Sequence, residues 1–301
     1  MLYDVFSFFN ELDILDERLS YLYDYVDYFV ICESNTTHVG KVKPLYFSDN
    51  FQRFQKFNNK IIHLIYDGRQ EIDNPWINEN LQRNYILNNL NLNSNDKIII
   101  SDVDEIPSIH FIERLRSYNG SDLLIAIQEL SYFWPNYRRS DLPYWIGGSR
   151  GFNYKHLLNL RFLNSNYSQT FLKSYNQGVT LTQIRLSNIG IPITLGGWHL
   201  SYMGGRDSIR NKILSFAHSE EKIRIGDKIH EHIDNFINSG KNFFGKNELY
   251  ISQGSFNSII LKQDIITTSK YTFIISARWF FIKMFLIFKI KIKYYVNLLL
   301  Q

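Results

Sequence analysis

The chain is poor in several residue types, and each shortage excludes a class of structure. Cys32 is the single cysteine among 301 residues, so neither an intrachain disulfide nor a cysteine-based metal site can form. This cysteine usage favours a reducing compartment. No uninterrupted apolar run approaches the ~20 residues that a membrane-spanning helix needs. The first residues lack a basic segment followed by an apolar one, so we expect no secretory signal and a cytoplasmic location.

Charge is unevenly distributed along the chain. The net charge is +4, yet residues 271–301 contain five basic residues and no acidic one. The rest of the chain is therefore nearly neutral, which argues against a general nucleic-acid binder. With 45% hydrophobic and 21% charged residues, the composition is typical of a globular protein.

Apolar runs alternate with helical patterns over the first hundred residues. The predicted strands are residues 3–9, 28–32, 60–65 and 97–101, and the predicted helices are residues 11–23 and 79–89. This alternation is typical of an α/β domain with a mainly parallel central sheet. Because no repeat or Gly/Ser linker interrupts it, we predict one domain over residues 1–245 and a C-terminal extension over residues 246–301.

Three carboxylates follow the fourth predicted strand directly. Asp102 and Asp104 have an Asp-x-Asp spacing and are followed by Glu105. Ligands of α/β sheets bind beyond the carboxyl ends of strands, and carboxylates there suit Mg²⁺ or Mn²⁺ shared with substrate phosphates. Three acids in four residues repel one another, which also favours a bound cation. The alternative is an acidic turn before a helix that starts near Pro107.

Segments on both sides of this cluster resemble glycosyltransferase family 17, the family of the β-1,4-mannosyl-glycoprotein β-1,4-N-acetylglucosaminyltransferases. They occur in order over roughly residues 2–245. The matching segments are residues 4–15 with Arg18 and Leu19, residues 26–35 with Thr37, Gly40, Lys41 and 43–45, residues 82–84, residues 101–107 and residues 196–202.

The resemblance implies a GT-A type, Rossmann-like domain. It also implies an inverting transfer of a sugar, with UDP-N-acetylglucosamine as the expected donor and Mn²⁺ or Mg²⁺ as the cofactor. Animal members carry an N-terminal membrane anchor, whereas this chain starts at the catalytic block. We therefore expect a different glycan acceptor, such as a bacterial or viral surface polysaccharide or its lipid-linked precursor.

Two other functions compete with glycosyl transfer. A sugar nucleotidyltransferase normally has a glycine-rich phosphate loop near its N-terminus, and residues 1–30 contain no glycine. A non-catalytic carbohydrate-binding module on the same scaffold has no need of both aspartates and His199. The sequence therefore favours the transferase.

The expected metal ligands are Asp102, Asp104 and His199. His199 lies two residues after Gly197, in a segment where glycine lets the backbone approach a ligand closely. Its imidazole suits a divalent metal or the donor diphosphate. A histidine satisfied within the core is the alternative. Glu105 is expected to orient the loop or to bind a sugar hydroxyl.

Further donor contacts are expected from Glu33, Lys41, Lys43 and Arg83, besides Asp102 and Asp104. Glu33 would bind the base or ribose, and the three cations would bind diphosphate oxygens, Arg83 through a bidentate fork. The alternatives are a solvated loop glutamate and ordinary surface charges.

An inverting transfer needs a base that accepts the acceptor's hydroxyl proton. Glu129 follows the apolar residues 123–128 and is expected at the end of another strand. Asp141 is its rival, within an aromatic stretch that, with Trp134, suits stacking on a sugar acceptor. His230-Glu231-His232 lacks the His-Glu-x-x-His spacing and is interpreted as part of a polar helix.

The C-terminal residues 271–301 mix aromatic and basic side chains. Basic residues among bulky apolar ones are typical of a segment that lies on an anionic membrane surface. We therefore predict a peripheral position at the inner face of the membrane. A final helix packed on the domain is the alternative.

Overall fold

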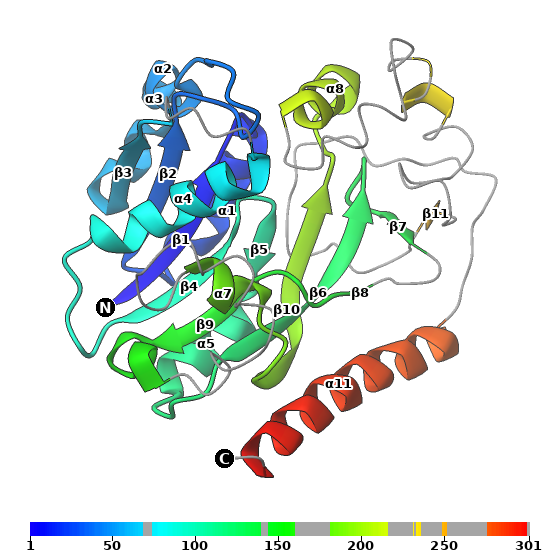
Figure 1. Cartoon of the computed structure of the whole chain (residues 1–301). Coiled ribbons are helices and arrows are strands. Elements are labelled where there is room, and N and C mark those ends of the chain that lie inside the picture. The colour runs from blue at the N-terminus through cyan, green and yellow to red at the C-terminus, as the bar shows by residue number, and fades with distance from the viewer. Residues whose placement is uncertain are drawn as a thin grey trace.

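In the computed structural model, four neighbouring parallel strands form the N-terminal half of the central sheet (Figure 1). Their order is β3-β2-β1-β4, with bounds Ile61–Tyr66, Tyr28–Ser34, Leu2–Phe8 and Lys97–Asp102. This is the order of a Rossmann-type half sheet. The structure describes residues 1–68, 74–139, 144–159, 181–215, 231, 233–235, 249–251 and 276–299.

Two of the helices begin after a capping side chain. α1 is Leu12–Leu22, and α4 (Pro75–Asn88) begins with proline after the capping side chain of Asn74. Short helices α2 (Tyr46–Asp49), α3 (Phe51–Phe54) and η1 (Gln55–Lys60) connect β2 to β3. α5 (Ile109–Ser117) begins after Ser108, whose hydroxyl accepts a hydrogen bond from the Phe111 amide. The acidic cluster therefore does not cap this helix.

The second half of the sheet is mixed. β9 (Arg150–Asn153) runs antiparallel to β4 and joins it to β6 (Leu124–Tyr132). β10 (Ile191–Ser201) is parallel to β6 and antiparallel to the short β5 (Glu105–Pro107). The remaining described elements are β7 (Tyr137–Arg139), β8 (Tyr144–Trp145), η2 (Tyr154–Asn159), α7 (Leu181–Leu186), α8 (Gly205–Ser215), β11 (Leu249–Ile251) and α11 (Ser276–Leu299).

Successive side chains of the central strands point to opposite faces and divide the core in two. On β1, Leu2 and Phe6 pack with the leucines of α1. Tyr3 and Val5 pack on the other face, in a cluster that includes Ile86 of α4 and Ile184 of α7. On β4 the same alternation places Ser101 toward α1 and Asp102 toward α4 and α7.

One glycine lets β10 reach the acidic loop. Gly197 has φ +126°, and a Cβ there would collide with the carbonyl oxygen of Ile106 on β5. The glycines before His199 thus permit close contact between strands, and the close approach of this segment to a ligand stays a prediction.

The predicted α/β domain with its parallel central sheet is confirmed, and each of the four strands lies within two residues of its predicted bounds. The helix predicted to begin near Pro107 is present as well: Pro107 ends β5, and α5 begins at Ile109. One local prediction was wrong. β6 continues to Tyr132, because residues after Glu129 keep pairing with β10, so Glu129 is not at a strand end.

The C-terminal extension contacts the predicted domain at two described places. β11 pairs with β7, and Ile290 of α11 is buried in the core. The division at residue 245 stays a prediction. Within the described part of the chain, no helix is long and apolar enough to cross a membrane.

Candidate active site

The backbone that carries the three carboxylates is held by a buried arginine of α1. The Arg18 Nη1 donates to the carbonyl oxygens of Asp102, Val103 and Glu105 at 2.9, 3.1 and 3.1 Å. Its Nε and Nη2 bind both carboxylate oxygens of Asp4 at 2.8 and 2.6 Å. Both side chains are fully buried, and the pair fixes the loop after β4 in one conformation.

Asp102 is neutralised by two arginines. Its Oδ1 lies 2.8 Å from Arg83 of α4 and its Oδ2 lies 2.5 Å from Arg185 of α7. Burial would raise the pKa of Asp102, but Arg185 and Arg83 outweigh it and hold that pKa well below its usual range. Asp102 therefore stays ionised and arranges two guanidinium groups beside the loop.

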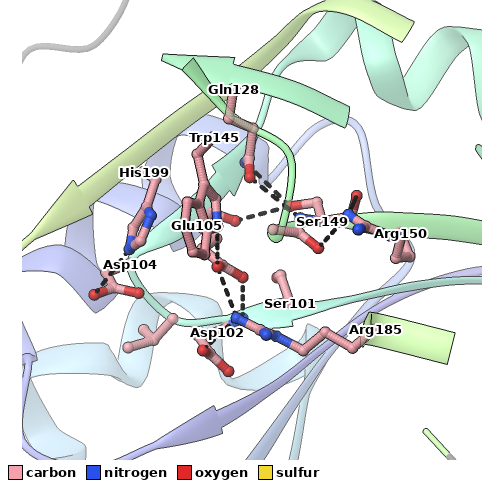
Figure 2. Close-up of polar contacts among 12 residues, drawn as sticks. Ser101, Asp102, Asp104, Glu105, Gln128, Trp145, Ser149, Arg150, Arg185 and His199 are labelled. Atoms are coloured by element: carbon pink, nitrogen blue, oxygen red, sulfur yellow. Dashed lines mark hydrogen bonds and ion pairs between the residues drawn. The ribbon is translucent and has the colours of Figure 1, made fainter. Parts of the chain in front are cut away.

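Glu105 is buried among donors on the same side. Its Oε1 accepts from the indole Nε1 of Trp145 at 2.8 Å and from Arg185 at 2.7 Å. Its Oε2 accepts from the backbone amide of Asp102 at 2.9 Å. Figure 2 shows Glu105 between Trp145 and Arg185. Of its two predicted roles, orienting the loop is the one these contacts support.

Asp104 lies on the other side of the loop, between a lysine and a histidine. Its Oδ2 is 2.6 Å from Nζ of Lys212 on α8 and 3.8 Å from Nε2 of His199 on β10. Burial would raise the pKa of Asp104, but Lys212 and His199 outweigh it and lower it. Lys212 also lies 3.3 Å from Glu11. Repulsion between the acids is therefore no evidence for a bound cation, because Arg83, Arg185 and Lys212 compensate their charge.

The predicted metal ligands fit a divalent cation in part. Asp104 and His199 converge (Figure 2), and His199 Nδ1 is buried without a hydrogen-bond partner among the described residues. Both Asp102 oxygens are already ion-paired. Across the described ranges, no group of three or more His, Cys, Asp or Glu residues is arranged to hold a metal. Magnesium sites often use one or two carboxylates plus substrate phosphates, so Asp104, with His199 beside it, is the part of the predicted set that fits a divalent cation.

Glu33 is not a solvated loop residue. It lies in β2, fully buried, and its Oε1 accepts a hydrogen bond from the Phe47 amide at 3.0 Å. Lys43 and His63 lie 3.7 and 3.3 Å from its carboxylate. Burial lowers the pKa of Lys43, although Glu33 opposes that change. These contacts hold the segment before α2 against the sheet.

The other predicted residues are dispersed. Lys41 is exposed, and its backbone amide binds the Thr37 hydroxyl at 3.1 Å. Glu129 is half-buried and lies 3.3 Å from Arg138 of β7. It follows Gln128, whose amide reaches the carbonyl of Ile106 near the cluster, so Glu129 points to the opposite face of β6. Asp141 and the histidines 230 and 232 lie outside the described residues.

Several residues that build the site were missed by the sequence predictions. Arg18 had a signal, because it interrupts the apolar face of the helix between Leu15 and Leu22. Arg185 and Lys212 had none, since their partners lie 83 and 108 residues away. Trp145 belongs to the aromatic stretch that also contains Asp141, but the sequence did not place it at the acidic loop. The centroid of its ring lies 4.9 Å from that of the His199 imidazole.

Comparison with known proteins identifies the family of this arrangement. The model of "Glycosyltransferase family 17" matches residues 1–153, about half of the chain. The match includes Arg18, Arg83 and the acidic loop. Arg185, His199 and Lys212 lie beyond it.

Curated relatives extend the similarity. β-1,4-Mannosyl-glycoprotein 4-β-N-acetylglucosaminyltransferases of Rattus norvegicus and Homo sapiens are each 26% identical, over 254 and 230 residues. The alignments cover 76% and 68% of this chain and 45% and 41% of those proteins. The chain thus spans less than half the length of these relatives.

Solved structures give a more distant match. A crystal structure of the galactosyltransferase LgtC with donor and acceptor sugar analogs has a TM-score of 0.36 and 11% identity. It covers 68% of this chain and 74% of that one. An active-site mutant of LgtC gives a TM-score of 0.36 with 10% identity.

Proposed function

The chain belongs to glycosyltransferase family 17, and from that premise we propose that it transfers N-acetylglucosamine from UDP-N-acetylglucosamine to a glycan or lipid-linked glycan, with inversion and with help from Mn²⁺ or Mg²⁺. The observation that carries the proposal is the facing pair of Asp104 and His199 beside the Lys212 ammonium. Asp104 lies just after the carboxyl end of β4, where α/β sheets bind ligands, and His199 reaches it from β10.

The proposed donor site is made by residues on both sides of the loop. Asp104 and His199 would hold the cation, which supplies Lewis-acid neutralisation of the departing diphosphate. Asp102 is better suited to positioning Arg83 and Arg185 than to binding the cation, because both its carboxylate oxygens are paired with these arginines. Arg83 and Arg185 are thereby presented next to the loop, where their remaining N–H groups suit phosphate oxygens. Lys41 is exposed and would reach the diphosphate from the loop after β2.

Two buried groups serve the donor site indirectly. Glu33 and Lys43 fix the segment that precedes α2 and so shape the region beyond the end of β2. Direct contact with the base or ribose would require Glu33 to leave its buried position, so we assign it a positioning role.

Glu129 and Asp141 are the two proposed candidates for the base on the acceptor side. The Glu129 carboxylate is partly exposed, is held by Arg138 and lies on the face of β6 opposite to Gln128. The base would accept the proton of the attacking hydroxyl as the sugar–diphosphate bond breaks. Glu129→Gln keeps the shape of the side chain and removes its basic carboxylate. Loss of transfer with unchanged donor binding would assign the role to Glu129, and unchanged transfer would assign it to Asp141.

A UDP-release assay tests the proposed function. The full chain is incubated with UDP-N-acetylglucosamine and other UDP-sugars, with and without Mn²⁺, beside an Asp104→Asn variant. We expect Mn²⁺-dependent UDP release that is fastest with UDP-N-acetylglucosamine and at least ~100-fold slower in the variant. Release of pyrophosphate from UTP and a sugar phosphate would instead indicate a nucleotidyltransferase. Carbohydrate binding without turnover of any donor would indicate a binding module.

A further inference from the structure

The C-terminal helix α11 packs on the domain through one narrow stripe. Leu286 and Ile290 are one turn apart and are 7% and 1% exposed. Ile290 belongs to the core cluster that contains Ile98 and Ile125 of the central sheet. Figure 1 shows α11 as a single long helix at the edge of the molecule. Its position is therefore fixed by burial of one face.

The opposite face of the same helix is apolar and exposed. Phe285 and Phe288 are 63% and 61% exposed. Further large apolar side chains exposed on α11 are Met284, Ile292, Tyr295 and Val296. At about 100° per residue these six side chains fall on one side of the helix, away from Leu286 and Ile290. A contiguous exposed patch of this kind marks an interaction surface.

Lysines border this apolar face on both edges. Lys289 and Lys293 lie on the edge next to Phe285 and Val296, and Lys291 lies on the edge next to Met284, following the same helical rotation. All three lysines are exposed. The helix also contains Arg278 and Lys283 and has no aspartate or glutamate.

We propose that this face of α11 lies flat on an anionic lipid surface. The aromatic and aliphatic side chains would enter the headgroup–acyl boundary, and the lysines would extend along it to lipid phosphates. The 24 residues of α11 give about 36 Å of helix along the surface. Because Leu286 and Ile290 stay on the domain, the helix can bind lipid without leaving the fold.

Charge favours a membrane over a second copy of the chain. Two such helices packed face to face would bring their lysines together with no acid on either helix to neutralise them. An anionic bilayer supplies the missing negative charge, worth roughly 1 kcal/mol for each lysine near the surface. The inference does not depend on the proposed function, since it rests on α11 alone.

Vesicle co-sedimentation of the full chain tests the proposal. The vesicles are phosphatidylcholine alone or phosphatidylcholine with about 30 mol% phosphatidylglycerol at low salt. We expect binding to the anionic vesicles, reduced about 30-fold in Lys289→Gln/Lys293→Gln and at least ~10-fold in Phe285→Ser/Phe288→Ser. Matched controls are Lys56→Gln/Lys155→Gln and Ile65→Ser, exposed residues outside α11, which should bind like wild type.

Circular dichroism melting establishes that each variant is folded before it is compared. Equal binding by wild type and Phe285→Ser/Phe288→Ser would overturn the proposal. So would equal binding to neutral and anionic vesicles, or binding to neither. A wild-type dimer that becomes monomeric in Phe285→Ser/Phe288→Ser would assign the face to a second copy of the chain instead.

Discussion

Arg18 shows at the scale of one residue how the acidic loop depends on a distant helix. Its guanidinium satisfies three carbonyl groups of the loop and the buried carboxylate of Asp4. The Ser149 hydroxyl also donates to the Glu105 carbonyl, at 3.0 Å. Arg18 is the side chain that joins all three carbonyls to α1, so the loop and α1 are expected to lose their arrangement together when it is removed.

Arg18→Met should therefore lower the free energy of unfolding by about 3–5 kcal/mol, the usual cost of leaving one partner of a buried ion pair uncompensated. Urea denaturation measures it. Arg53→Met is the matched control, because Arg53 pairs with Asp13 at the surface, where such pairs contribute about 0–1 kcal/mol. Equal losses in the two variants would contradict the role given to Arg18.

Lys212 is the residue whose effect on metal binding is least obvious from the sequence. It lies between Asp104 and Glu11, at 2.6 and 3.3 Å. A divalent cation bound to Asp104 would have to share the carboxylate with this ammonium or displace the ammonium from it. We expect Lys212→Met to bind Mn²⁺ at least ~10-fold more tightly than wild type without a donor, since two carboxylates lose their counter-charge.

Electron paramagnetic resonance of free Mn²⁺ measures this affinity directly, without turnover. Lys155→Met is an exposed lysine replaced in the same way and should not change it. Weaker Mn²⁺ binding in Lys212→Met would mean that Lys212 supports the cation rather than competing with it.

At the scale of elements, the site depends on how closely β10 approaches β5. Gly197 allows that approach, whereas Gly205 at the start of α8 also has positive φ, +79°, but has open space around it. Gly197→Ala should destabilise the fold by about 3 kcal/mol or more, against about 1–2 kcal/mol for Gly205→Ala. Thermal or urea unfolding of the two variants compares them, and a similar cost for both would exclude the predicted collision.

The elements of the parallel half were predictable from sequence because their signals are local. The runs at residues 28–32 and 98–100 are continuous and apolar, as is typical of strands covered on both faces. β5 and the extension of β6 beyond Glu129 were not predictable, because each exists through pairing with β10, which lies about 70–90 residues later in the chain.

The candidate site was predictable to a similar degree. Asp102 and Asp104 were found because an apolar strand precedes them and family segments surround them. The arginines and the lysine that neutralise them come from α4, α7 and α8, and only the fold brings those helices to one place. For that reason the sequence could not show that the repulsion between the acids is compensated by these side chains.

At the scale of the whole molecule, the ion pairs of the buried acids should make the free energy of unfolding fall in acid. The folded pKa of Asp102 lies below its unfolded value, so its contribution to stability is present above about pH 4 and is lost as pH falls through the folded pKa. The wild type should therefore lose stability in acid more steeply than Asp102→Asn, which should be less stable at neutral pH. Urea unfolding at pH 7 and pH 3 gives both slopes, and parallel slopes would show that Asp102 is not stabilised by its arginines.

The central proposal is that Asp104 and His199 hold a divalent cation against a UDP-sugar. Calorimetric titration of the full chain with UDP-N-acetylglucosamine, with and without Mn²⁺, tests it most directly. Wild type should bind the donor at least ~10-fold more tightly with Mn²⁺, and Asp104→Asn and His199→Ala should lose that gain while Lys155→Met keeps it. Donor binding that is equally tight without Mn²⁺, or that keeps its Mn²⁺ dependence in Asp104→Asn, would contradict the claim.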